Sequence, residues 1–359
     1  MARREELEDL KNYGFDAAFA EQIDFCGIGV IRYIGIKNLL WISTTPIMDA
    51  VSYNLVGFQI FRKIDPDFPN IREIAANASL CFVNIDEMFD LPRPIIQKNV
   101  YIGGLGVQKP KPLDQKFSTL MEKGEKGVII VSLGTIAPFH AFKQVTKVAF
   151  ANAIRSMLDY HFILKIEKDD TTTPSLFNDV PNCDFVEWLP QSDVLAHPRL
   201  KLFVMHGGIN GLTEAMLRGV PVVVIPVFAD QFRNGRNAER RGVGKVILKL
   251  ELTEDSIKST IRDVLDHDRY KTNAVRLSKL MSEKPFSPEE RLIKWTEFAV
   301  RHGVLDILHV EGSRMNSIIY FNLDVFATFA FVLCTTLFAL CKVFYAISSR
   351  KRDTKLKCQ

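Results

Sequence analysis

The residues best suited to chemistry stand where a predicted strand ends and a predicted helix begins. An apolar run of strand type, Leu202 to Met205, is followed by His206-Gly207-Gly208 and then by a segment of helical character, Asn210 to Leu217. The glycines let an anionic ligand approach the backbone, and the free amides and positive dipole end of a helix favour its charge. The side chains of His206 and Asn210 can add hydrogen-bond donors. The pattern therefore predicts a phosphate-binding turn.

Residues on both sides of this turn suit the other parts of a nucleotide sugar. Upstream, Trp188 offers a flat face for a base and Gln191 an amide for its polar edges; downstream, Glu214 can accept from ribose hydroxyls. After the next apolar run, Val222 to Ile225, the pair Asp230-Gln231 stands at a second strand end, where it can bind sugar hydroxyls. Ligands of open α/β sheets bind at such carboxyl ends of strands.

Each of these residues has a structural explanation when it is taken alone. A histidine followed by two glycines after a strand is most often a tight turn. Trp188 alone would be a core aromatic, Glu214 a solvated helix residue and Asp230 a helix cap. The order and spacing of the whole set favour half of a sugar-nucleotide site.

The set resembles the signature of family 1 glycosyltransferases, in the form found in animal UDP-glucuronosyltransferases. The matching segments are WLPQSDVLAHP, FVMHGGINGLTEA, GVPVVVIP and FADQFRN, flanked by WISTTPIMDAVSY (41 to 53), VSLGT (131 to 135) and KWTEFAVRHG (294 to 303). The resemblance covers nearly the whole chain. It implies an α/β fold of GT-B type, with two Rossmann-like domains, and transfer of glucuronic acid or glucose from a UDP-sugar to a small lipophilic acceptor with inversion.

The resemblance also implies a role for each motif residue. Trp188 would stack on uracil, Gln191 and Glu214 would contact uridine and ribose, and Asp230 and Gln231 would hold the sugar. The residues expected at the diphosphate are Ser132, His206, Gly208 and Asn210, with Gly211 beside them. The UDP-sugar is a co-substrate, so neither a cofactor nor a metal ion is expected.

The N-terminal part departs from the family pattern. Members begin with a signal peptide and a histidine that acts as general base on the acceptor hydroxyl, oriented by an aspartate. Here Met1-Ala-Arg-Arg-Glu-Glu has no apolar leader, and no histidine precedes His140. The segment FDAAFAEQIDFCG (15 to 27) matches the stretch with the aspartate, and Glu21 stands in its place. We expect the start of the pattern to be missing, as in a shortened isoform or an incomplete gene model, and transfer to be impaired.

The other histidines near the donor motifs are expected to be structural. His140, His161 and His197 fall within or beside the predicted donor domain rather than on the acceptor side. Their positions do not match that of the base.

Composition fits a large globular chain and argues against a nucleic-acid partner. The 359 residues are 47% hydrophobic and 25% charged, enough to bury the core of about two domains. The net charge is +4, and five basic residues against Asp353 after residue 349 also give +4, so the remainder is near neutral. A nucleic-acid site would need a basic face.

The C-terminal region is typical of a membrane anchor. Val325 to Cys341 is apolar and long enough to cross a bilayer, and a basic cluster follows it directly. The alternative is a buried core helix. The cluster should face the cytosol, and Lys355 and Lys357 resemble a dilysine signal for return to the endoplasmic reticulum. We expect a single-pass protein of that membrane, with its bulk in the lumen.

The cysteines and one sequon bear on disulfide, zinc and glycosylation sites. The six cysteines are scattered without a CxxC pair, which argues against zinc and against a disulfide framework. Asn77-Ala-Ser79 is a glycosylation sequon if that region is lumenal.

Alternation of predicted strands and helices indicates parallel, doubly wound sheets. Strands are expected at Val128 to Leu133, Phe162 to Ile166 and the two runs named above; a helix is expected from about His140 to Leu158 and helical periodicity over 254 to 302. No GxGxxG or Walker motif follows a strand. The expected parts are 1–110, the acceptor-side domain; 111–305, the donor domain; 306–322, membrane-proximal; 323–347, the membrane helix; and 348–359, a basic cytosolic tail.

Two functions are therefore expected from the sequence. The first is a membrane-bound UDP-glycosyltransferase of the UDP-glucuronosyltransferase type. The alternative is a non-catalytic protein that binds UDP-sugar or pairs with full-length family members as a homo- or hetero-oligomer. The missing histidine separates the two.

Overall fold

The computed structural model describes residues 4–21, 25–44, 62–63, 65–69, 71–134 and 138–356. The chain separates into two compact units, Met1–Leu308 and His309–Gln359. Parts of the motifs matched above, residues 45–53 and Thr135, lie outside the described residues, as do Lys357 and Cys358 of the tail.

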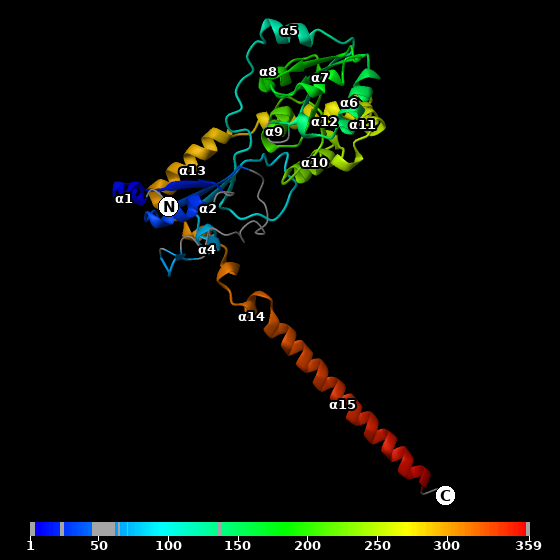
Figure 1. Cartoon of the computed structure of the whole chain (residues 1–359). Coiled ribbons are helices and arrows are strands. Elements are labelled where there is room, and N and C mark those ends of the chain that lie inside the picture. Colours follow the sequence, from blue (N-terminus) through cyan, green and yellow to red (C-terminus); the bar gives the residue numbers. More distant parts are fainter. Residues whose placement is uncertain are drawn as a thin grey trace. The chain divides into compact units, whose positions relative to one another are not determined.

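The first sheet of the larger unit has four parallel strands in the order β1-β2-β3-β4 (Figure 1). Its inner strands are short apolar runs buried on both faces, as expected for parallel strands covered by helices. The elements of this part are α1 (Arg4–Tyr13), β1 (Ala18–Glu21), α2 (Phe25–Tyr33), β2 (Leu39–Ser43), α4 (Ile71–Ala76), β3 (Leu80–Val83) and β4 (Asn99–Tyr101).

The second sheet has six parallel strands in the order β10-β9-β8-β5-β6-β7. Its strands are β5 (Gly127–Ser132), β6 (Tyr160–Lys165), β7 (Cys183–Val186), β8 (Leu200–Met205), β9 (Val222–Val224) and β10 (Gly244–Val246). Its helices are α5 (Gln115–Met121), α6 (Gln144–Arg155), α7 (Thr172–Ser175), α8 (Gln191–Leu195), α9 (Ile209–Leu217), α10 (Gln231–Arg240), α11 (Glu254–Asp266) and α12 (Asp268–Ser282).

Helices cover both faces of this second sheet. Alternate residues of β5 face opposite sides: Val128 and Ile130 pack with α9 and α12, whereas Ile129 and Val131 pack with α6 and α11. The expected doubly wound α/β architecture is therefore confirmed. Residues 102–114, which connect β4 to α5, hold no helix or strand.

One helical prediction needs correction. The helix expected from His140 starts at Gln144, because Phe142 and Lys143 are extended, with ψ near 150°, and only a short 3-10 turn, Phe139–Ala141, precedes them. The helical periodicity expected over 254–302 is confirmed: α11 and α12 are followed by α13 (Pro288–His302), which begins at a capping box formed by Ser287 and Glu290.

Helix α13 packs on the first sheet. Leu40, Leu80 and Phe82 form a small core with Ala299 and Leu305. A buried polar chain follows the same contact: Asn38 Nδ2 donates to the Ala299 carbonyl (2.8 Å), Ser79 Oγ donates to Asn38 Oδ1 (2.7 Å), and the Leu305 amide donates to Ser79 Oγ (3.2 Å). Asn77, the first residue of the sequon, is exposed.

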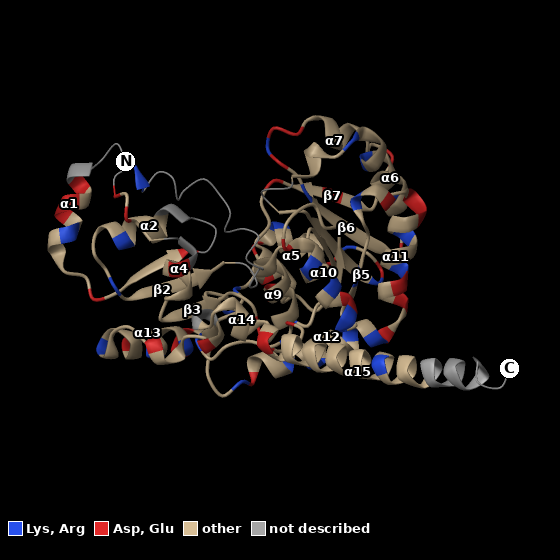
Figure 2. Cartoon of the chain, turned by 90° about the horizontal axis from the view of Figure 1, so that it is seen from below, with Lys and Arg blue, Asp and Glu red and all other residues tan. Residues whose placement is uncertain are grey.

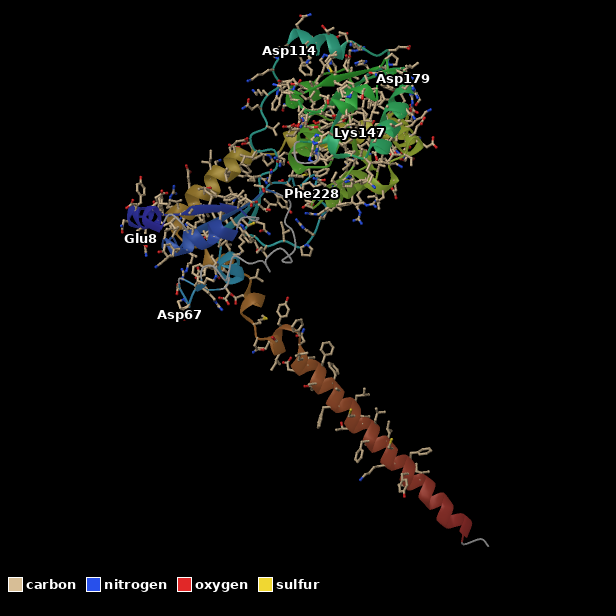
Figure 3. The ribbon with its side chains drawn as sticks, viewed as in Figure 1. Glu8, Asp67, Asp114, Lys147, Asp179 and Phe228 are labelled. Carbon is tan, nitrogen blue, oxygen red and sulfur yellow. The ribbon has the colours of Figure 1, made fainter. Side chains whose placement is uncertain are left out.

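The smaller unit contains α14 (Ser317–Tyr320) and α15 (Leu323–Leu356). Leu323–Ile347 of α15 is long and apolar enough to span a membrane, with a mean hydropathy of 2.1. This stretch is almost free of charge in Figure 2, and its side chains stand exposed in Figure 3. A membrane anchor at this helix is compatible with these properties.

Candidate functional site

The turn between β8 and α9 has the form that its glycines predicted. Gly207 has φ of 91°, and a Cβ there would lie 2.6 Å from Val224 Cγ1, so a side chain is excluded on both grounds. Gly208 is the N-cap of α9, and no side chain caps the amides of its first turn. These amides are therefore free to bind an anion.

His206 is held between two glycines. A Cβ at Gly134 or at Gly208 would lie 2.5 Å from the imidazole ring. Burial lowers the pKa of His206 below its usual value, so the ring is neutral at pH 7. Its Nδ1 is buried without a hydrogen-bond partner in the part of the chain described, which leaves one ring nitrogen available to a ligand. Ser132, at the end of β5, is buried and pairs in register with Met205 just before this histidine.

Two of the residues predicted to bind uridine, Gln191 and Glu214, lie in direct contact. Gln191 Nε2, at the start of α8, donates to Glu214 Oε2 on α9 (2.6 Å). A Cβ at Gly211 would lie 3.3 Å from the same Gln191 nitrogen, so this glycine lets the two helices approach. Trp188 stands just before α8 and is 77% exposed, which argues against the core explanation for this residue.

The Asp230-Gln231 pair begins α10 behind the same turn. Asn234 Nδ2 donates both to Asp230 Oδ2 (2.7 Å) and to the Gly207 carbonyl (3.0 Å), which ties Asp230 to the β8–α9 turn. Burial raises the pKa of Asp230, and the bond from Asn234 partly offsets it. Gln231 is buried, and its Oε1 accepts from the amides of Val227 and Phe228 (2.8 and 3.1 Å), so it shapes the preceding loop.

The carboxyl ends of the first sheet meet this turn from the opposite side. Asn84, which follows β3, donates from Nδ2 to Asn210 Oδ1 on α9 (2.8 Å). Glu21 ends β1, and its Oε1 accepts from Thr44 Oγ1 after β2 (2.7 Å). Sequence reasoning missed Thr44 and Asn84, although both are polar residues just after buried strands, a signal that could have found them.

A cavity of about 300 Å³ lies where these ends meet. Polar groups of Thr44, Asn84, Asn210 and Glu214 line it together with an apolar wall from Ile42, Ile102, Leu105 and Val107. The arrangement offers hydrogen bonds on the α9 side and an apolar surface on the side of the first sheet.

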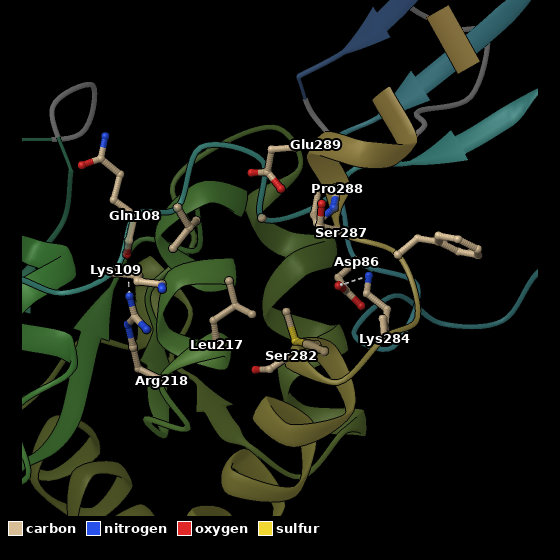
Figure 4. Close-up of a pocket in the computed structure, with 15 residues that line it drawn as sticks. Asp86, Gln108, Lys109, Leu217, Arg218, Ser282, Lys284, Ser287, Pro288 and Glu289 are labelled. Carbon is tan, nitrogen blue, oxygen red and sulfur yellow. Dashed lines mark hydrogen bonds and ion pairs between the residues drawn. The ribbon is translucent and has the colours of Figure 1, made fainter. Parts of the chain in front are cut away.

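A second cavity, of about 260 Å³, lies between residues 103–109 and the start of α13 (Figure 4). Lys284 Nζ contacts Asp86 Oδ2 there (2.6 Å), and Arg218 donates to the Gln108 carbonyl (2.7 Å). None of the predicted donor residues lines it. The buried Lys284–Asp86 pair fixes the loop before α13, and we assign the cavity no part in the site.

Comparison with solved structures defines the fold. The chain matches the UDP-glucose: anthocyanidin 3-O-glucosyltransferase in complex with UDP with a TM-score of 0.64, 16% identity, and coverage of 84% of this chain and 79% of the other. It matches CalG4, the calicheamicin glycosyltransferase, with a TM-score of 0.58 and 17% identity over 84% and 79% of the two chains. The fold is that of GT-B glycosyltransferases.

Sequence comparison defines the family. The family model described as "UDP-glucoronosyl and UDP-glucosyl transferase" matches residues 59–357. The putative UDP-glucuronosyltransferase ugt-50 of Caenorhabditis elegans is 35% identical over 99% of this chain and 76% of its own length. UDP-glucuronosyltransferase 1A1 of Mus musculus is 30% identical over 86% of this chain and 56% of its own length. The chain belongs to this family of hexosyltransferases, as the resemblance of its motifs implied.

Proposed function

We propose that the chain binds a UDP-sugar across the turn between β8 and α9 and presents the sugar to the ends of the first sheet. Trp188 stacks on uracil, and the Gln191–Glu214 pair holds uridine and ribose. The diphosphate lies against Ser132, His206, Gly208 and the first turn of α9. Asp230 accepts from sugar hydroxyls. The observation that carries the proposal is the His206 ring, with its buried and unpaired Nδ1, next to Gly208 at the start of α9, where no side chain caps the first-turn amides.

The acceptor is a small lipophilic alcohol, phenol, amine or acid. The apolar wall of the cavity, from Ile42 and Ile102 to Leu105 and Val107, supports an apolar acceptor body. Its nucleophilic atom attacks the anomeric carbon from the face opposite UDP. The new bond to that carbon forms as the bond to the phosphate oxygen breaks, UDP leaves, and the configuration inverts. The proton of the acceptor passes to a base.

A polypeptide limited to these 359 residues has no histidine before His140 to act as the base on the acceptor side. Glu21 Oε1 accepts from Thr44 Oγ1 (2.7 Å). General-base assistance contributes about two to four decades of rate. We therefore propose that this polypeptide binds the donor and transfers the sugar slowly.

The test is calorimetry with uridine, UDP, UDP-glucose and UDP-glucuronic acid. His206→Ala should weaken UDP more than uridine, because only UDP carries the diphosphate. Equal losses for both ligands would remove the phosphate role of His206. Transfer to a panel of phenols, measured on the unaltered chain, should be slow or undetectable; robust turnover would place the base elsewhere.

The second candidate is a partner without turnover. It requires only the donor half of the site, since donor binding can survive without a base. Co-expression with a full-length family member and affinity capture would support it, provided that the captured enzyme changes its affinity for UDP-sugar.

We also propose that α15 anchors the chain in the endoplasmic reticulum membrane, with residues after about 348 in the cytosol. The apolar span Leu323–Ile347 and the basic residues that follow support this placement. Alkaline carbonate extraction should leave the protein in the membrane pellet, and exchange of Lys355 and Lys357 for serine should release it toward later compartments.

A further inference from the structure

Helix α10 carries a buried polar stripe that runs away from the proposed donor site. Asp230, Asn234, Asn237 and Arg241 are spaced by four, three and four residues, so they share one face of the helix. Asn234 and Asn237 are 0% and 1% exposed. Amides buried this deeply must find partners, and the partners show what the stripe holds.

The far end of the stripe forms hydrogen bonds to a turn that follows β3. Arg241 Nε donates to the Phe89 carbonyl (3.0 Å), and its Nη2 donates to the carbonyl of Asp90. Asn237 Nδ2 donates to Asp90 Oδ1 (3.2 Å). The first sheet is thereby tied to α10, the helix that begins with the sugar-binding motif.

Arg233 joins the first turn of α10 to the same turn after β3. Its Nη2 lies 2.6 Å from Asp90 Oδ1, and the Asp90 side chain is only 2% exposed. Arg233 stands three residues after Asp230, the N-cap of α10, so the two side chains are neighbours on the helix. Asp90 binds Arg233 through Oδ1, and its other oxygen, Oδ2, lies 3.3 Å from Nη2 of Arg93. Asp230 and Asp90 are therefore two carboxylates that can pair with Arg233, and in this structure Asp90 does so.

We propose that Asp90 is a positioning residue for the donor sugar: by binding Arg233 and Asn237 it keeps the guanidinium from Asp230, so that Asp230 Oδ1 can accept from sugar hydroxyls while its Oδ2 accepts from Asn234. The inference rests on the proposed function, and it adds a residue from the other sheet, outside the sugar-nucleotide motifs. An arginine that turned to Asp230 would occupy the acceptor atoms that the sugar needs.

The experiment compares UDP with a UDP-sugar on the full chain. Calorimetry gives the ratio of the two dissociation constants, with UDP-glucose or UDP-glucuronic acid, whichever the unaltered chain binds more tightly. Asp90→Asn should leave the Kd of UDP within about twofold and raise that of the UDP-sugar about tenfold, the effect of losing a hydrogen bond to a charged group. Asp179→Asn is the control. It removes the carboxylate that pairs with Arg155 in the part of the chain built on the second sheet (Figure 3), and it should change neither dissociation constant.

A second substitution separates positioning from general damage. In the Asp90→Asn chain, Arg233→Gln removes the released cation and should restore the ratio, whereas a merely structural role predicts further loss. Should Asp90→Asn fail to give a cooperative thermal transition, Arg233→Gln alone decides the matter, because it should retain the sugar-dependent ratio.

Three results would overturn the inference: an unchanged ratio, equal weakening of UDP and UDP-sugar, or no restoration by Arg233→Gln. A fourth result, no binding of UDP by the unaltered chain, would overturn the proposed function and this inference with it. Failure of the inference alone is recognised by intact UDP binding.

Discussion

Trp188 is a strongly exposed residue of the predicted donor site, and its exposure is what a stacking role requires. A large aromatic side chain that is 77% exposed gains little from the fold, so its removal should cost little stability. The base of a nucleotide would bury it. Loss of the side chain should therefore affect the ligand and leave the protein folded.

Trp188→Ala should weaken UDP by roughly one to two decades, since stacking of a base on an aromatic side chain contributes about 1 to 3 kcal/mol. Titration calorimetry with UDP gives the value. Trp295→Ala on α13 is the matched control and should leave UDP affinity unchanged. An unaltered Kd for the Trp188 variant would move the uracil site elsewhere.

The buried imidazole of His206 gives a pH effect with a definite sign. Its pKa in the folded chain is lower than the 6.5 of an exposed histidine, so below that pH the unfolded chain binds a proton that the folded chain refuses. The contribution of His206 to stability is therefore full above pH 6.5 and is lost as the pH falls below it. His161, buried beside Asp184, acts in the same direction.

His206→Gln should remove this part of the pH dependence. Between about pH 7.5 and about pH 5.5, the melting temperature of the variant should fall less than that of the unaltered chain. Because His161 remains in both proteins, the difference isolates His206. Parallel curves would mean that the ring is protonated, or accessible to water, in the folded state.

At the scale of elements, the side chain of His206 decides which residue can stand at position 208 of the β8–α9 turn. Gly208 has φ of −61°, a conformation that alanine adopts freely, but its Cβ would lie 2.5 Å from the His206 ring. Substitution there tests the position of the imidazole without straining the backbone. The glycine is required by its neighbour rather than by its dihedral angles.

Gly208→Ala should displace His206 and reduce UDP affinity by at least about tenfold, with a smaller effect on uridine. The control is Gly27→Ala in α2, where the nearest atom to a new Cβ is 4.0 Å away and a helix gains from alanine. Calorimetry of both variants, with circular dichroism to confirm their helices, makes the comparison. Retention of full UDP affinity by Gly208→Ala would show that the ring is not required where it lies.

The local pattern was enough to predict β5, β6, β8, β9 and the turn of the donor half, because buried parallel strands are uninterrupted apolar runs and the glycines mark their ends. It did not predict the two short edge strands, β7 and β10. It could not give the contacts that join the two sheets. Asn84 and Asn210 are 126 residues apart, and Asp90 and Arg233 are 143 apart. Such pairs are set by tertiary packing. The start of α6 was missed for a smaller reason, a local turn that interrupts an otherwise helical pattern.

At the scale of the whole molecule, the direction of α15 decides on which side of a membrane the sheets work. In a form of the chain that enters the secretory pathway, the basic residues after α15 should stay in the cytosol and Asn77 should be lumenal. Endoglycosidase digestion should then shift the gel mobility of the protein, and the Asn77→Gln variant should show no shift. Absence of a shift, together with protease sensitivity of residues 1–308 in intact microsomes, would reverse the orientation.

Burial of the Ser79 hydroxyl limits the time during which Asn77 can be glycosylated. It is the third position of the sequon, yet in the folded chain it is buried and bonded to Asn38 and to the Leu305 amide, 226 residues later. The sequon is therefore complete and accessible only while Leu305 has not been made or has not yet docked. At about 5 to 20 residues per second, synthesis of the intervening chain takes about 10 to 45 s. A glycan at Asn77 would thus record that the modifying enzyme reached this site before the segment after α13 docked against Ser79.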